Sequence, residues 1–191
     1  MRSSLPIRVL VSGEIERGKT GTCQEAARLL RERGWKVAGL LSPGIWKGGE
    51  KIGIKALDLH SRQSRILAQR FDQDEELIGV QTRRWRFDPA IIEWCNSILR
   101  DATPCDLLVV DEFGPLELVR GEGLIDGLPV VDAGHFRLGL MVVRSHLLPI
   151  AQERWPAAHT LMIHHPEEIP KRVDEILEHS VRIDRSTLIP G

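Results

Sequence analysis

Apolar residues fall along the chain in two kinds of run, short continuous ones and longer ones with helical spacing. The short runs at residues 7–12, 35–41 and 106–110 are mainly apolar, which is typical of parallel strands buried on both faces. Residues 19–33 and 90–100 carry apolar side chains three or four positions apart, which predicts amphipathic helices. This alternation indicates an α/β fold, a three-layer α/β/α sandwich with a mostly parallel sheet.

The second half of the chain continues the alternation. We expect strands within residues 134–143 and at 160–163, and helices at 147–154 and 166–179. The last dozen residues show no motif and are expected to form a tail. With 191 residues and no repeats or low-complexity linkers, residues 1–191 are expected to form one domain.

Helix boundaries are marked by residues with specific capping chemistry. Gly34 follows the first helical run and is expected to end it, because glycine readily adopts the left-handed conformation found after helices. Asp88 and Pro89 precede the second run, as an N-cap followed by proline at the first helical position.

A phosphate-binding pattern lies between the first strand and the first helix. Residues 13–20 match G-x-x-x-x-G-K-[ST] in the strand–loop–helix context that this loop requires. The residues expected to contact a nucleotide are Gly13, Glu14, Ile15, Glu16, Arg17, Gly18, Lys19, Thr20 and Gly21. Gly13 permits the turn and Gly18 lets backbone amides approach the phosphates. Lys19 supplies a charge to the β- and γ-phosphates and Thr20 a hydroxyl to Mg²⁺, while the acidic side chains of the loop can point to solvent.

The apolar run at residues 107–110 leads into two carboxylates, Asp111 and Glu112, in the manner of a Walker B strand. The carboxyl ends of parallel strands meet at one edge of the sheet, so this edge also carries the phosphate loop. We expect Asp111 to hold Mg²⁺ and Glu112 to orient or deprotonate a water molecule. Since adjacent strand residues point to opposite faces, Glu112 can do this only if the strand ends there.

Residues 44–87 interrupt the strand–helix alternation with turns and short strand-like runs at 51–59, 65–68 and 77–80. We interpret this region as a β-rich excursion from the core, near the nucleotide. Trp46 marks a binding surface if it is exposed. The basic cluster 83–86 is expected to face solvent with Trp85 packed on the core, the alternatives being stacking on a nucleobase or binding of a single strand.

Other side chains give weaker signals. Arg144 ends an apolar run and is a candidate for a cationic contact to the γ-phosphate, the alternative being a solvated strand end. The spacing of His159, His164 and His165 fits no common zinc pattern. Glu117 has no assigned role beyond bracing its loop.

Composition limits the function classes. The formal net charge is −1, so the chain lacks the strong positive field typical of nucleic-acid or membrane binding. No apolar run approaches the ~18 residues of a membrane span, and the first apolar run leads straight into the phosphate loop rather than a signal-peptide cleavage site. Three cysteines without paired spacing indicate a reducing compartment, so we expect a cytoplasmic protein.

The motifs resemble a known family, the small P-loop nucleoside-triphosphatases first described from thermophiles, also called the cancer-related nucleoside-triphosphatases. The most specific part is Asp-Glu-Phe-Gly-Pro-Leu-Glu-Leu at 111–118. The likeness also includes the phosphate loop and residues 39–43, 51–59, 84–88 and 142–144. It implies a RecA-like core that slowly hydrolyses several nucleoside triphosphates with Mg²⁺ and little base discrimination. Glu16 departs from the family, which usually has glycine there.

The leading hypothesis is therefore a Mg²⁺-dependent nucleoside-triphosphatase acting on ATP, GTP and other nucleoside triphosphates, with Lys19, Glu112 and Arg144 as catalytic residues. Two alternatives stay open. One is a small-molecule or nucleotide kinase, whose acceptor would explain the excursion at 44–87. The other is a nucleotide-dependent switch or assembly factor that binds a homo-oligomeric or other protein partner.

Overall fold

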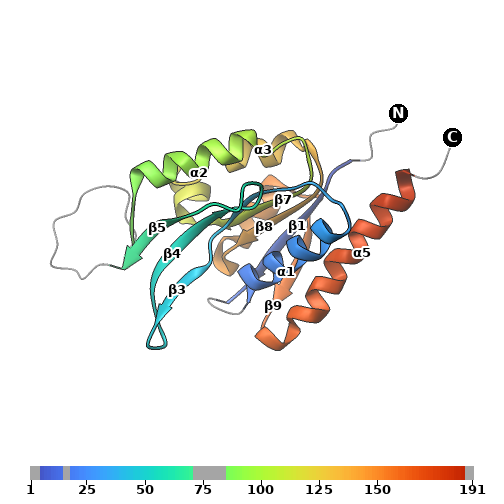
Figure 1. Ribbon diagram of the computed structural model, residues 1–191. Coiled ribbons are helices and arrows are strands. Elements are labelled where there is room, and N and C mark those ends of the chain that lie inside the picture. The colour runs from blue at the N-terminus through green and yellow to red at the C-terminus, as the bar shows by residue number, and fades with distance from the viewer. Residues whose placement is uncertain (1–4, 15–17, 71–84, 188–191) are drawn as a thin grey trace.

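The computed structural model describes residues 5–14, 18–70 and 85–187, which form one mixed β-sheet with helices on both faces (Figure 1). The strands run in the order β6-β5-β4-β2-β7-β8-β1-β9, and β3 pairs with β4. Their bounds are β1 Ile7–Gly13, β2 Val37–Leu41, β3 Gly44–Lys47, β4 Glu50–Asp58, β5 Ser64–Arg70, β6 Trp85–Phe87, β7 Cys105–Phe113, β8 Phe136–Val143 and β9 His159–Ile163.

The central strands β2, β7, β8, β1 and β9 are all parallel to one another. These strands include every core strand predicted from the apolar runs, so the expected α/β architecture is confirmed. Their carboxyl ends lie at one edge of the sheet, where the phosphate loop follows β1.

The excursion at residues 44–87 adds antiparallel strands to this same sheet. β4 pairs with β2 through Leu40 opposite Asp58, and β5 and β6 follow outward. The region is thus β-rich as predicted, but it extends the sheet rather than leaving it. The predicted strand at 77–80 lies outside the described residues.

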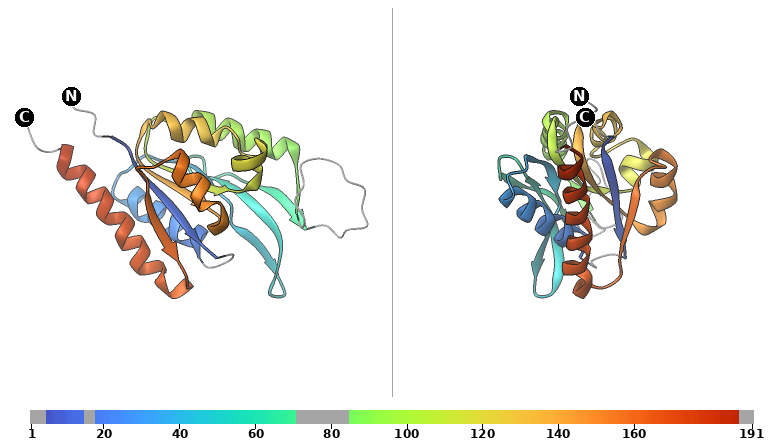
Figure 2. Two further views of the ribbon diagram at one scale, coloured as in Figure 1. Left: turned by 180° about the vertical axis from the view of Figure 1, so that it is seen from behind. Right: turned by 90° about the vertical axis from the view of Figure 1, so that its right-hand side faces the viewer.

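Helices form the two outer layers, as the end-on view in Figure 2 shows. Their bounds are α1 Lys19–Glu32, α2 Pro89–Asp101, α3 Gly127–Ala133, α4 Leu148–Arg154 and α5 Ile169–Thr187. Helices α1 and α5 pack on one face through Leu30 and Ile176, whereas α2, α3 and α4 cover the other through residues such as Leu99 and Val131. Apolar side chains on both faces explain why the central strands read as continuous apolar runs.

The predicted helix boundaries are confirmed at two positions. Gly34 follows the C-cap residue of α1, Arg33, and has a φ of +84°. The side chain of Asp88 accepts a hydrogen bond from the Ala90 backbone N–H at 2.9 Å, and Pro89 is the first residue of α2. The caps therefore act as the sequence indicates.

The predicted C-terminal tail is wrong, because α5 continues to Thr187. Ile183 is 5% exposed and belongs to the apolar cluster beneath α1 and α5. The buried residue one turn earlier is Ser180, whose hydroxyl donates to the Leu177 carbonyl at 2.6 Å. This polar residue interrupts the apolar stripe, so the spacing of apolar residues in the sequence does not reveal the last turns of the helix.

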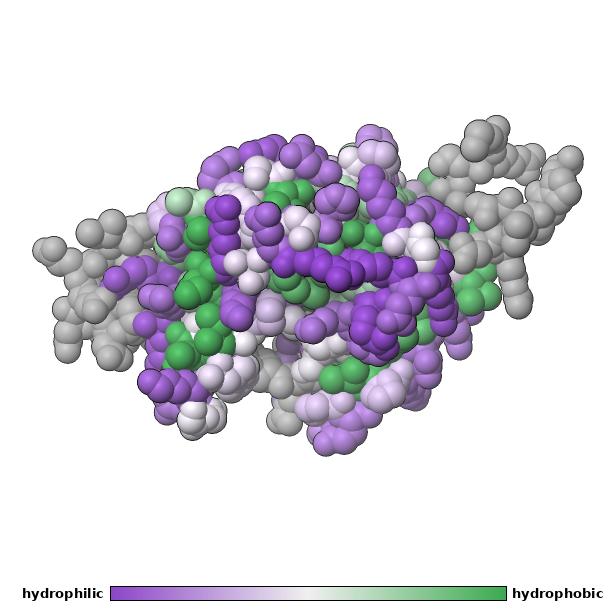
Figure 3. Space-filling model, viewed as in Figure 1, coloured by the Kyte–Doolittle hydropathy of each residue, from purple (hydrophilic) through white to green (hydrophobic). Residues whose placement is uncertain are grey.

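The outer surface is mostly polar. The face in Figure 3 is largely hydrophilic, with apolar side chains in small groups. Within the described part of the chain, none of the helices is long and apolar enough to cross a bilayer.

Candidate functional site

The phosphate loop connects β1 to α1 and depends on two glycines. Gly13 has a φ of +144°, and a Cβ atom there would lie 2.0 Å from the carbonyl oxygen of Ile163 on β9. Gly18 has a φ of +99°, and a Cβ there would lie 2.9 Å from Cδ1 of Ile169. A larger residue at Gly13 would therefore clash with the backbone of β9, whereas one at Gly18 would strain the backbone and press on the Ile169 side chain.

The rest of the loop is partly described. The Glu14 side chain is exposed, as expected for a loop that binds through its backbone. Residues 15–17, which are Ile, Glu and Arg, lie outside the described residues. Gly18 caps α1 without a side-chain hydrogen bond, and Thr20 and Gly21 in the first turn line the adjoining cleft. This leaves the start of α1 facing the cleft, an arrangement that favours anions.

Lys19 is buried at the start of α1 and folds back over the loop. Its Nζ donates to the carbonyl oxygens of Gly13, at 3.1 Å, and Glu14, at 2.5 Å. Burial lowers the pKa of Lys19, and the negative charges of Glu112 and Asp111 oppose this shift. The amine therefore lies within the electrostatic reach of both carboxylates.

Asp111 lies at the carboxyl end of β7 and is 2% exposed. Its Oδ2 accepts from the Ser42 backbone N–H at 3.0 Å, and the Thr20 hydroxyl donates to the same carboxylate. Burial raises the pKa of Asp111 to about 6, although both hydrogen bonds favour the charged form. Three elements thus place oxygen atoms of Thr20, Ser42 and Asp111 side by side.

Glu112 reaches the same cleft for a reason that the sequence does not show. We expected β7 to end at Glu112, but the strand continues to Phe113. Asp111 is opposite Val142 and Phe113 is opposite Val143, so Glu112 is an extra residue in the ladder. This bulge breaks the strict alternation of faces, so both carboxylates line one cavity.

Arg144 follows β8, the strand beside β7, and forms an ion pair with Glu112. Its Nε lies 2.6 Å from Glu112 Oε1, and both side chains are about one-third exposed, at 34% and 32%. The alternative of a strand end that contacts only solvent does not hold, because the guanidinium pairs with Glu112. Arg144 is instead part of the cleft wall.

These side chains surround a cleft of about 670 Å³. It lies against the phosphate loop on one side and strands β3, β4 and β6 on the other. The wall also includes Ser42, Lys51 and His146, to which the sequence alone assigns no role. Ser42 follows a buried strand at the loop-bearing edge of the sheet, a signal that could have identified it. Lys51 has no such signal, because it reaches the cleft only through the antiparallel pairing of β4.

Two tryptophans contribute to the same wall. Trp46 is 52% exposed, and Trp85 is half-buried with Lys51 Nζ 5.6 Å from its ring centre. Trp85 belongs to neither apolar core cluster, so the prediction that it packs on the core is wrong. Arg83 and Arg84 lie outside the described residues.

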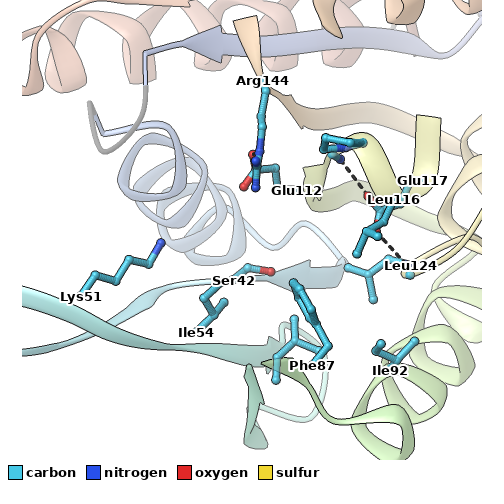
Figure 4. A pocket seen from close by; sticks show the side chains of 14 residues that line it. Ser42, Lys51, Ile54, Phe87, Ile92, Glu112, Leu116, Glu117, Leu124 and Arg144 are labelled. Carbon is cyan, nitrogen blue, oxygen red and sulfur yellow. Dashed lines mark hydrogen bonds and ion pairs between the residues drawn. The ribbon is translucent and has the colours of Figure 1, made fainter. Parts of the chain in front are cut away.

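A smaller cavity of about 70 Å³ adjoins the cleft (Figure 4). One of its walls is held by Glu117, which is 7% exposed. Its two carboxylate oxygens accept from the backbone N–H groups of Gly114, at 2.8 Å, and Leu124, at 2.9 Å. Burial raises the pKa of Glu117, and these hydrogen bonds oppose that shift. Glu117 thus braces the loop, as the sequence suggests.

The histidines that we considered as metal ligands do not form a metal-binding group in the described part of the chain. The ring of His159 lies beside that of His179, with 4.8 Å between the ring centres and a tilt of 40° between the planes. Among residues 5–14, 18–70 and 85–187, no group of three or more His, Cys, Asp or Glu side chains is arranged to hold a metal ion. The three cysteines are free and buried.

Comparison with known proteins identifies the family. A family model described as NTPase matches residues 8–122, more than half of the chain, including the phosphate loop and the two carboxylates. The chain belongs to this NTPase family. The resemblance and the enzyme class expected from the motifs are thereby confirmed.

Individual relatives of this NTPase extend the match along the chain. The nucleoside-triphosphatase THEP1 of Methanopyrus kandleri is 28% identical over 185 residues, which cover 92% of this chain and 96% of the relative. That of Thermofilum pendens is 30% identical over 124 residues, covering 65% of this chain and 67% of the relative.

Solved structures confirm the fold of the NTPase. A human cancer-related nucleoside triphosphatase superposes with a TM-score of 0.65 at 18% identity, covering 92% of this chain and 96% of the other. THEP1 from the hyperthermophile Aquifex aeolicus gives 0.62 at 15% identity, covering 90% and 98%.

Proposed function

We propose that this protein hydrolyses the γ-phosphate of ATP, GTP and other nucleoside triphosphates to yield the diphosphate and phosphate, slowly and with Mg²⁺. The observation that carries the proposal is the convergence of Lys19, Asp111 and the Glu112–Arg144 ion pair on one cleft beside the phosphate loop. Phosphoryl transfer requires positioning and charge stabilisation rather than covalent chemistry by the protein, and this group of side chains supplies both.

Thr20 and Asp111 are the residues that we propose would hold Mg²⁺. Hydroxyl and carboxylate oxygens are ligands that this hard cation prefers, and few protein ligands suffice when phosphates supply the others. Asp111 is buried with a raised pKa, so a bound cation would compensate a carboxylate that the protein leaves poorly solvated. When bound, Mg²⁺ would neutralise charge that develops on the phosphates.

Glu112 is the proposed base that orients or deprotonates the attacking water. Arg144 holds this carboxylate through Nε at 2.6 Å. A guanidinium has five N–H donors, so Arg144 can keep Glu112 in place and still donate to an oxygen of the γ-phosphate. Lys19 would neutralise the β- and γ-phosphates by replacing its contacts to the loop carbonyls with contacts to phosphate oxygens.

Broad base specificity is supported by the aromatic side chains of the cleft. Trp46 and Trp85 present rings on its wall, and every nucleobase can stack on such a ring.

We also propose that residues 1–191 act as one P-loop NTPase domain, and that the protein is cytoplasmic. The free thiols of Cys23, Cys95 and Cys105 are consistent with a reducing compartment.

The decisive experiment compares phosphate release from ATP, GTP, CTP and UTP with Mg²⁺ for the wild type, Lys19→Ala and Glu112→Gln. We expect slow turnover of all four nucleotides by the wild type. Lys19→Ala should lose nucleotide binding, and Glu112→Gln should bind nucleotide but lose turnover by roughly 10²-fold or more, the effect of removing a general base. Unchanged hydrolysis by Glu112→Gln would overturn its assignment.

A further inference from the structure

We propose that the small cavity beside Glu112 and Arg144 binds a compact alcohol with an apolar body, which accepts the γ-phosphoryl group in place of water. This inference rests on the proposed nucleotide site and adds a second substrate to it. The protein would then be a phosphotransferase whose slow hydrolysis occurs when the alcohol is absent.

The first observation is that the small cavity and the large cleft meet at the reacting groups. Both are lined by Ser42, Lys51, Ile54, Glu112 and Arg144. A molecule in the small cavity therefore has its open end at the Glu112–Arg144 pair, on the side where we place the γ-phosphate.

The second observation is that most side chains of the remaining wall are apolar, apart from Glu117. In Figure 4, Glu112 and Arg144 stand on one side of the cavity and Ile54, Phe87 and Ile92 on the other. Leu67, Leu116 and Leu124 complete the apolar wall and are each at most 5% exposed. Water needs two to four polar partners in an enclosed site, and this wall provides few. Hydrolysis needs only water as the acceptor, so it does not by itself require a pocket for an apolar group next to the base.

The third observation is that the pocket is held in shape. Its walls come from β4, β5, β6, α2 and the π-helical turn Leu116–Arg120. Glu117 ties this turn to Gly114 and Leu124 through two buried hydrogen bonds. A buried carboxylate is costly unless it is well hydrogen-bonded, so this brace keeps the apolar wall in a single position.

The size of the pocket limits the ligand. Its volume of about 70 Å³ is about half the ~150 Å³ of a buried apolar cavity that binds benzene, so it encloses part of a small ring while the rest of the ligand lies in the adjoining cleft. A ligand with a small apolar body and one hydroxyl at the open end fits the arrangement of polar and apolar groups.

The transfer step is balanced without a further reactant. The hydroxyl oxygen of the alcohol attacks the γ-phosphorus, and the bond from that phosphorus to the β–γ bridging oxygen breaks. The hydroxyl proton passes to Glu112, and the nucleoside diphosphate leaves. The products are the diphosphate, a phosphate monoester and the proton, which Glu112 then releases to solvent.

Benzyl alcohol is a suitable probe, with toluene as the analogue that lacks the hydroxyl and glycerol as a polar alcohol. Methyl NMR spectra would report binding to the wild type and to two variants that fill the cavity, Leu124→Phe and Leu67→Phe. We expect toluene and benzyl alcohol to shift methyl signals in the wild type, and glycerol to leave them unchanged. Both variants should lose the shifts.

The same proteins are then incubated with ATP, Mg²⁺ and benzyl alcohol, and the products are followed by ³¹P NMR. We expect benzyl phosphate in a one-to-one ratio with the additional ADP, at a rate about tenfold above hydrolysis because the pocket positions the hydroxyl. Both cavity-filling variants should keep their basal phosphate release and lose benzyl phosphate.

The outcomes separate the two proposals. If the wild type hydrolyses ATP in a Lys19-dependent manner but neither binds the probes nor forms benzyl phosphate, the acceptor pocket is refuted and the NTPase stands. Binding or transfer that survives in both folded variants also refutes the pocket. If no nucleotide is bound or turned over, the proposed function fails, and the NMR shifts alone decide whether the cavity takes apolar ligands.

Discussion

Asp111 shows, at the scale of a single residue, how surroundings set the chemistry of a side chain. Two hydrogen bonds favour its charged form, yet burial is the larger effect and raises its pKa from 3.8 to about 6. A folded protein that binds this proton more tightly than the unfolded chain loses stability as pH rises between the two values.

The variant Asp111→Asn should remove this pH dependence. The protein is measured free of metal and nucleotide. The unfolding free energy of the variant minus that of the wild type should rise by up to about 3 kcal/mol between about pH 4 and pH 6. Above that range the difference should level off. Urea denaturation at several pH values with a chelator measures the difference. A difference that is constant with pH would contradict the raised pKa.

Glu117 provides a second prediction at the residue scale. Glu117→Gln replaces one acceptor oxygen by an NH₂ group, which leaves at least one buried N–H, of Gly114 or Leu124, without an acceptor. We expect a loss of about 1–3 kcal/mol in unfolding free energy, the cost of an unsatisfied buried donor. The matched control is Glu122→Gln, the same change at an exposed ion pair with Arg120, which should cost less than about 1 kcal/mol. Equal effects in the two variants would show that Glu117 is not a brace.

At the scale of elements, the end of β7 determines the site. A regular strand would turn Asp111 and Glu112 to opposite faces of the sheet. The bulge at Glu112 places both at the cleft, where Arg144, directly after β8, is the partner of Glu112. The end of this strand, not its apolar interior, therefore carries the proposed chemistry.

Helix α5 allows a test of the corrected C-terminal boundary. Ile183→Ala removes a buried side chain and should lower the unfolding free energy by about 2–5 kcal/mol. Val181→Ala, two residues earlier on the same helix and 41% exposed, should change it by less than about 1 kcal/mol. Chemical denaturation of both variants gives the comparison. A negligible effect of Ile183→Ala would mean that the last turns do not contribute to the core.

At the scale of the whole molecule, the cleft joins parts of the sheet that are distant along the chain. The loop after β1, the ends of β2, β7 and β8, and the antiparallel strands β3, β4 and β6 all contribute to it. A nucleotide that contacts all of them should stabilise the entire fold rather than one segment.

A non-hydrolysable ATP analogue with Mg²⁺, at about 100 times its dissociation constant, should add about 2.7 kcal/mol of stability. For a chain of this size, that corresponds to a rise in Tm of about 5–10 °C. Differential scanning fluorimetry measures the shift, which Lys19→Ala should abolish. Lys36→Ala is the matched control. Lys36 lies before β2, away from the cleft, and its Nζ donates to the Pro104 carbonyl oxygen, so this variant should keep the shift. Loss of the shift in both variants would argue against a specific role for Lys19.

Much of the fold was predictable because its signals are local. The apolar runs of β1 and β7, the caps at Gly34 and Asp88, and the loop around Lys19 each depend on residues within a few positions of one another. Where a local pattern is interrupted, as by Ser180 in α5, the prediction stopped too early. The short helix α3 has too few residues to show a helical period.

The sequence by itself determined the layered α/β core, the position of the G-x-x-x-x-G-K-T loop between β1 and α1, and the placement of Asp111 at the loop-bearing edge. These follow from periodicity and from the rule that parallel strands end at one edge of a sheet. Only the tertiary structure decided that the 44–87 strands extend the sheet, that Glu112 pairs with Arg144, and that an apolar cavity lies beside them. The physical reason is that pairing, register and cavities depend on contacts between residues tens of positions apart, which no local pattern encodes.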